Sequence, residues 1–165
     1  MLMPTPSKTM PTLDAVRRLL SDLFGRPVTF TKSPVLAGPP KDKVVAAFYT
    51  GDDGTVTVIA MADVRFAVMA GACLTGFPTP MAERQIETDQ IDDMVMENFR
   101  EIMNVCGTLF SDGKTAHARL AALHRIPPAE WPADMAERTK RPAGRLDGTA
   151  TFPNYGSGRL SFLVL

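Results

Sequence analysis

Residues 92–109 read DDMVMENFREIMNVCGTL, and the pattern of this stretch determines the expected fold. Its apolar residues recur at alternating spacings of four and three, the period of an α-helix with one buried face. The acidic stretch before it favours a helix start, because Asp89 is an N-cap candidate and Asp92 and Asp93 suit the positive end of a helix dipole. The sequence therefore predicts a long amphipathic helix whose buried stripe is Val95, Phe99, Ile102, Cys106 and Leu109.

Upstream of this helix the chain alternates between helical and strand patterns. A first helix begins after Thr12, an N-cap candidate, and stops at Gly25, a C-cap candidate. A later helical pattern ends before Gly76. The expected elements are a helix over 13–24, a β-prone piece over 28–31, strands over 43–50 and 55–61 joined as a hairpin, and a helix over 62–74.

Downstream of residue 109 the sequence predicts a break, a further segment and a final hairpin. The break falls at 111–113, the segment covers 115–124, and Pro127 and Pro128 close it. Strands are expected over 145–152 and 158–165. This order of elements predicts an α+β fold with an antiparallel sheet and helices packed on it. We expect a flexible tail over 1–10 and a single domain over 11–165.

Composition excludes several classes of function. Lys plus Arg and Asp plus Glu number 18 each, so the overall charge does not favour nucleic acid or an anionic membrane as a partner. The chain has neither a signal-peptide pattern nor an apolar run long enough to span a membrane, which predicts a cytoplasmic protein. Both cysteines lie in apolar helical patterns, which predicts buried, reduced thiols. One local basic cluster without interleaved aromatic residues is interpreted as a solvated loop: Arg138, Lys140, Arg141 and Arg145.

Polar residues occupy the other face of the long helix. Glu97, Glu101 and Asn104 are spaced by four and three residues and therefore stack along one face, with Asp93 one turn earlier. Three carboxylates in such a row repel one another, and within the helix only Arg100 is placed to relieve Glu97. This row predicts a site for a cationic partner.

The same residues resemble the signature of the CheC/CheX/FliY group of response-regulator phosphatases. That signature is Asp or Ser, three residues, Glu, two residues, Asn, twenty-two residues and Pro. Here Glu101 and Asn104 supply the Glu and the Asn, and Pro127 follows after twenty-two residues. The first position differs, because Glu97 stands where the family has Asp or Ser. The first helix carries no second Glu-x-x-Asn, so the resemblance implies one site per chain.

The resemblance implies a fold, a reaction and a partner. It implies a CheC/CheX-like domain that accelerates hydrolysis of the aspartyl phosphate of a CheY-like response regulator, in chemotaxis or two-component signalling. Glu101 and Asn104 would be catalytic, and Glu97 and Asp93 would contact the partner. The protein would need no cofactor or metal of its own, because the regulator supplies Mg²⁺. A homodimer is a further expectation, because some CheX-like members pair and the apolar segment 160–165 needs a cover.

Two alternatives remain open from the sequence. The first is a non-catalytic module that docks on a response regulator or a flagellar switch component through the same helix face, since Glu97 departs from the signature. The second is an unrelated metal or acid/base enzyme that combines the acidic residues of this helix with His117 or His124. The histidines lack the spacing of known metal motifs, so surface or capping roles are favoured for them.

Overall fold

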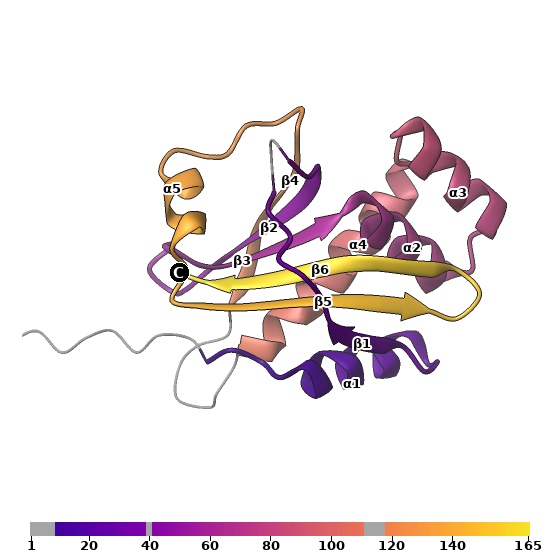
Figure 1. Cartoon of the computed structure of the whole chain (residues 1–165), viewed down its shortest axis with the longest axis horizontal. Coiled ribbons are helices and arrows are strands. Elements are labelled where there is room, and N and C mark those ends of the chain that lie inside the picture. The colour runs from indigo at the N-terminus through magenta and orange to yellow at the C-terminus, as the bar shows by residue number, and fades with distance from the viewer. Residues whose placement is uncertain (1–8, 39–40, 111–117) are drawn as a thin grey trace, which may run out of the picture.

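The computed structural model describes residues 9–38, 41–110 and 118–165, and within these ranges it has an α+β fold (Figure 1). One antiparallel sheet has the strand order β1-β5-β6-β3-β2-β4. The strands are β1 (Thr29–Lys32), β2 (Val44–Thr50), β3 (Val56–Asp63), β4 (Arg119–Ile126), β5 (Gly144–Phe152) and β6 (Gly156–Val164). The helices are α1 (Leu13–Phe24), α2 (Val64–Thr75), α3 (Thr79–Thr88), α4 (Asp93–Cys106) and α5 (Met135–Lys140), with a 3₁₀ turn η1 (Gly107–Phe110).

Local capping signals place the first two helices where the sequence predicts them. The Thr12 hydroxyl accepts the Ala15 backbone N–H at 3.0 Å, and α1 ends at Gly25 in the left-handed region. Asp63 caps α2 in the same way, and Gly76 ends it with φ of 69°. The two predicted hairpins are also confirmed, as β2–β3 and β5–β6. Met10, the last residue of the predicted tail, instead packs against the core, and residues 1–8 lie outside the described residues.

The sheet is covered on both faces, so its central strands are buried on both sides. Alternate residues of β2, such as Val45 and Ala47, face α1, α2 and α4, and we call this side the helix face. Figure 1 shows α2 and α4 side by side behind the sheet. The intervening residues Val44, Ala46 and Phe48 face the opposite side, here called the back face. Trp131 covers Phe48 edge-on there, with ring centroids 6.0 Å apart.

Helices α2 and α4 cross at very close range. A Cβ atom built on Gly71 would lie 2.4 Å from the Val95 carbonyl oxygen, so only glycine fits at this crossing. The Asn98 side-chain amide of α4 donates to the Gly71 carbonyl and to the Thr75 hydroxyl of α2, both at 2.9 Å. Backbone contact and a side-chain bridge thus fix how α4 is rotated against α2.

Three segments differ from the sequence expectation. Helix α3 was not predicted, and Asp89 ends it in the left-handed region with φ of 56° instead of capping α4, whose N-cap is Asp92. The described part of segment 115–124 belongs to strand β4, because it pairs with β2 along its length. The basic cluster was expected in a solvated loop. Instead, Arg138 and Lys140 lie on α5, Arg141 is the C-cap of that helix, and Arg145 lies at the start of β5.

Asp147 joins the irregular segment before β2 to the sheet. Its carboxylate accepts hydrogen bonds from the Arg145 guanidinium, the Ser161 hydroxyl and the Leu36 backbone N–H. Burial raises the pKa of Asp147, but these hydrogen bonds outweigh burial and hold the pKa below its ordinary value of 3.8. The charged form is therefore the one that the fold stabilises.

Replacing Gly71 tests the helix crossing. Gly71→Ala should lower the free energy of unfolding by about 1–3 kcal/mol, because the new methyl group overlaps the Val95 backbone. This loss should appear although alanine is the better helix former by about 1 kcal/mol. Gly51→Ala is the matched control, because its Cβ would meet nothing closer than the Asp53 carboxylate at 3.7 Å. Urea unfolding that shows equal stability for both variants would contradict the close crossing.

Replacing Asp147 tests the buried carboxylate. A lowered folded pKa stabilises the protein above the ordinary carboxyl value and loses that effect as pH falls through the folded value. Asp147→Asn should therefore be less stable than wild type near neutral pH, and the difference should shrink below pH 3.8, the ordinary value of the group. Chemical unfolding at several pH values measures this difference. A difference that does not change with pH, or an equal one for exposed Asp52→Asn, would show that the charge of Asp147 contributes nothing.

Candidate functional site

Helix α4 separates a buried face from a polar one. Its buried residues are Val95, Phe99, Ile102, Met103 and Cys106, which confirms the predicted stripe as far as the helix extends. Leu109 lies beyond the helix end, in η1, and is only partly buried. Burial raises the pKa of the Cys106 thiol to about 12, so this cysteine is not a nucleophile at neutral pH. Within the described residues both Cys73 and Cys106 are free thiols, as the sequence predicts.

The exposed face of α4 carries the four residues that the sequence singles out. Asp93, Glu97, Glu101 and Asn104 are all exposed and follow one another along one side of the helix. We call these four residues the ridge. Helix geometry gives a rise of about 1.5 Å per residue, so Glu101 and Asn104 lie roughly one turn apart. Their side chains are therefore close enough to contact one partner surface together.

The start of α4 is held by its cap and by α3. The Asp92 carboxylate accepts the Met94 backbone N–H at 2.8 Å, and the Asp92 backbone N–H donates to the Gln85 side chain at 2.9 Å. Asp93 follows in the first turn, where the helix dipole favours a carboxylate. The backbone that carries the Asp93 carboxylate is thus held in place by the cap and by α3.

The end of α4 is fixed immediately after Asn104. The backbone N–H groups at the C-cap donate to the carbonyls of Asn104 and Val105, as the helix tightens into η1. The buried Tyr49 hydroxyl of β2 donates to the Met103 carbonyl at 2.6 Å. A Cβ on Gly107 would lie 2.4 Å from the Ala118 carbonyl oxygen, so the helix end rests against the start of β4. Asn104 therefore stands on a backbone that is held from two sides.

The ridge side chains are not engaged by other residues that the structure describes. Among the described residues, Glu97, Glu101 and Asn104 make no hydrogen bond and no ion pair within the chain. The expected relief of Glu97 by Arg100 is absent from the ion pairs of the described residues. Carboxylates in such a state can pair with a cation, and a free carboxamide can donate to and accept from a water molecule. The ridge thus places three carboxylates and one carboxamide side by side on an exposed helix face.

Pro127 does not lie beside Asn104. Strand β4 starts against the end of α4 and runs back along it, until the Arg125 guanidinium reaches Asp89 at 2.7 Å, just before α4 begins. Pro127 follows the last residue of β4, near the start of α4, so it ends a strand and not a helix. Of the twenty-two residues between Asn104 and Pro127, those that the structure describes form the end of α4, η1, and β4 with the residue before it.

The histidine alternative is not supported by the described residues. His124 lies on β4 opposite Ala46 and stacks against Phe48 on the back face, with ring centroids 5.6 Å apart. It is thus on the other side of the sheet from the ridge. A surface or capping role was expected for this histidine, and its half-buried side chain instead packs against Phe48. His117 lies outside the described residues. In the part of the chain that the structure describes, no three acidic, histidine or cysteine side chains cluster as a metal site would require.

Three residues that matter to the site carry no clear sequence signal. Tyr49 and Asn98 hold α4 through bonds to distant elements, and neither partner is identifiable from local spacing. Met94 is 47% exposed in the first turn of α4, so an apolar side chain lies beside the ridge. The only sequence signal for the exposure of Met94 is its position in the helical repeat, next to the buried Val95.

No protein-family model matches the sequence, and no curated protein matches it. Solved structures match it at low identity. FliY from Thermotoga maritima aligns over 93% of this chain and 84% of its own, with a TM-score of 0.59 and 12% identity. The FliM middle domain from H. pylori aligns over 92% of this chain and 84% of its own, with a TM-score of 0.51 and 8% identity.

The chain has the CheC/CheX/FliY-like fold. A chain of the CheX-CheY-BeF3-Mg complex from Borrelia burgdorferi also aligns, over 92% of this chain and 94% of its own. Its TM-score of 0.43 and identity of 13% support no conclusion about this chain. The fold expected from the α4 motif is therefore confirmed, while the roles of the ridge residues stay predictions. No helix in the described ranges has the length and apolar character needed to cross a membrane.

Removing the Tyr49 hydroxyl tests how the end of α4 is held. Tyr49→Phe should lower the free energy of unfolding by about 1–3 kcal/mol, because the buried Met103 carbonyl loses its donor. Amide hydrogen exchange should speed up most in the last turn of α4 and in η1. Tyr155→Phe, which removes a hydroxyl bonded to the Phe77 carbonyl at the other side of the molecule, is the control and should leave α4 exchange unchanged. Unaltered exchange around Asn104 in Tyr49→Phe would contradict this role.

Proposed function

We propose that this protein accelerates hydrolysis of the aspartyl phosphate of a CheY-like response regulator in the cytoplasm. The observation that carries the proposal is the pairing of Glu101 and Asn104, which stand exposed one turn apart on a helix held at both ends and have no hydrogen-bond or ion-pair partner among the described residues. The CheC/CheX/FliY-like fold supports it, since this is the fold that the resemblance of the α4 signature implies.

The proposed chemistry divides the work between the two proteins. The regulator supplies the phosphorylated aspartate and the Mg²⁺ that neutralises the phosphoryl oxygens. Asn104 would hold the attacking water in line through its carboxamide, as a water-orienting Gln does in a GTPase. Glu101 would form a charge-assisted hydrogen bond with an active-site lysine of the regulator and so anchor α4 in the site. Neither residue forms a covalent intermediate.

The support around α4 suits a positioning role. A water-holding group contributes to rate only if its orientation is fixed before the reaction, because ordering it later costs entropy. Asn104 sits between the Met103 carbonyl, which is bonded to Tyr49, and the C-cap bonds of η1. Its backbone is therefore ordered before any partner arrives.

The remaining ridge residues suit recognition. Asp93 and Glu97 extend the negative charge of Glu101 toward the start of α4, and Arg100 is the one exposed cation among them. A row of like charges on an exposed face steers a basic partner surface and sets its orientation more than it adds affinity. We assign Asp93 and Glu97 to partner contact on this ground.

A docking module without catalysis is the second candidate. Glu97 is longer than the Asp or Ser of the signature, and its extra methylene would push the partner away from Asn104 at one end of the ridge. The fold alone, shared with FliY and the FliM middle domain, does not separate catalysis from docking. Catalysis and docking must be separated by kinetics.

Two substitutions on the ridge separate anchoring from catalysis. Asn104→Ala should abolish stimulated dephosphorylation yet leave affinity for the phosphorylated regulator largely intact, because a group that acts only in the transition state does not change ground-state binding. Glu101→Ala should weaken both, since an ion-pair anchor contributes to every bound state. Exposed Glu87→Ala on α3 is the matched control and should behave as wild type. The measurements are the rate of phosphate loss from a panel of receiver domains phosphorylated by a small-molecule donor, and binding to the same domains.

The outcomes distinguish the candidates. Full phosphatase activity in Asn104→Ala would remove this residue from the mechanism. Wild-type protein that binds a receiver domain but never speeds the loss of its phosphate would favour the docking module. In that case Glu97→Asp, which restores the side-chain length of the signature, tests whether the lost activity is due to Glu97.

A further inference from the structure

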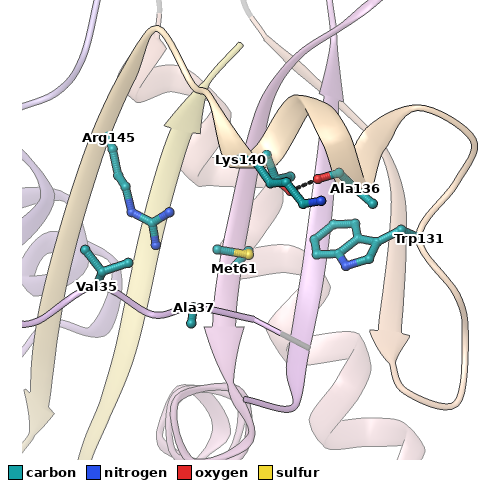
Figure 2. Close-up of a pocket in the computed structure, with 8 residues that line it drawn as sticks. Val35, Ala37, Met61, Trp131, Ala136, Lys140 and Arg145 are labelled. Atoms are coloured by element: carbon teal, nitrogen blue, oxygen red, sulfur yellow. Dashed lines mark hydrogen bonds between the residues drawn. The ribbon is translucent and has the colours of Figure 1, made fainter. Parts of the chain in front are cut away.

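The back face of the sheet carries a pocket of about 430 Å³ between the sheet, α5 and the segment before β2 (Figure 2). Its volume lies in the range of small-molecule sites, roughly 300–1,000 Å³. It is on the opposite side of the sheet from the ridge, so the proposed phosphatase function does not use it. The lining residues are Val35, Ala37, Met61, Trp131, Ala136, Thr139, Lys140 and Arg145.

One wall of the pocket is an ordered apolar surface. Trp131 is fixed edge-on against Phe48, and Met61 projects from β3 with only 2% of its surface exposed. Gly38 lies close to both, since a Cβ there would be 3.6 Å from the Met61 sulfur and 3.9 Å from the indole ring. Val35, with 59% of its surface exposed, stands at the rim. This wall can receive a flat or extended apolar group.

The other wall carries the basic residues that the sequence groups together. Arg145 is pre-organised: its Nε and Nη2 donate to the Asp147 carboxylate, and Nη2 also donates to the Leu36 carbonyl. Among the hydrogen bonds of the described residues, Nη1 of Arg145 has no acceptor, and Figure 2 shows the guanidinium turned into the pocket. The cluster interpreted from sequence as a solvated loop is thus partly the wall of a pocket.

Lys140 supplies the second cation. Its Nζ pairs with the Glu137 carboxylate at 2.8 Å, but both side chains are at least two-thirds exposed, at 67% and 78%. An exposed pair of this kind contributes little, about 0–1 kcal/mol, so Lys140 can exchange Glu137 for a better acceptor. Asp147 already compensates Arg145, and Lys140 is held only by the exposed Glu137, so Lys140 is the cation that can pair with a ligand of single negative charge.

We propose that this pocket binds a small amphipathic monocarboxylate. Its apolar body would lie against Trp131 and Met61, and its carboxylate would accept hydrogen bonds from Lys140 Nζ and Arg145 Nη1. The combination of an apolar wall with a few converging polar donors is the usual composition of a ligand site. A carboxylate between two such donors makes charge-assisted bonds that a neutral analogue cannot reproduce.

The single tryptophan of the chain makes the test specific. In a ¹H–¹⁵N spectrum of the full chain, Trp131 gives the one indole N–H resonance. Titration with 4-phenylbutyrate should shift this resonance saturably, whereas neutral 4-phenylbutyramide should bind at least about tenfold more weakly, because it loses the charge-assisted hydrogen bonds. Lys140→Met should weaken the binding of 4-phenylbutyrate and so reduce the difference in affinity between the two probes. Lys32→Met on β1, outside the pocket, should leave both affinities unchanged.

A filled pocket provides the second variant. Ala136→Phe places a ring in the pocket from the exposed side of α5 and should abolish the shift without affecting the fold. The proposal is overturned if phenylbutyrate gives no saturable indole shift, if the amide binds as well as the carboxylate, or if Ala136→Phe leaves the affinity unchanged.

Discussion

The contact between α2 and α4 at Gly71 is the constraint on which the rest of the structure depends. The absence of a side chain at Gly71 lets the Val95 backbone approach, and the Asn98 amide then bonds the Gly71 carbonyl directly. With this bridge in place α4 can present only one side to α2 and the core. The opposite side, with Glu97, Glu101 and Asn104, must then face outward. A core contact therefore decides which residues of α4 are exposed.

The same constraint explains why the ridge can be both exposed and ordered. Exposed side chains on loops lose orientation, but those of α4 project from a helix that is anchored at each end and along its inner face. Asp92 and Gln85 hold the start, and Tyr49 holds the last turn. The fold thus holds Glu101 and Asn104 at a fixed spacing on α4 without burying either of them.

Sequence patterns predicted what depends on neighbours in the chain. The caps at Thr12, Gly25 and Gly76 and the amphipathic period of α4 are local, and the structure confirms them. Helix α3 was missed because it buries only Ala82 and follows a proline. Its sequence therefore shows little of the apolar periodicity that predicts a helix. Asp89 ends that helix in the left-handed region, and its carboxylate pairs with Arg125 and Lys43, both distant in sequence. Helical periodicity predicted the exposed ridge. The hydrogen bonds of Tyr49 and Asn98 that support it join elements distant in sequence, so no local pattern predicts them.

If α4 meets a receiver domain through the ridge, as we propose, contact should perturb the ridge residues first. The most direct measurement is the set of backbone amide shifts of this protein when a receiver domain is added in a beryllofluoride-activated form. We expect the largest changes at Glu97, Glu101 and Asn104, with the back-face residues around Trp131 unchanged. Changes that fall on the back face or along β1, with α4 unaffected, would contradict it.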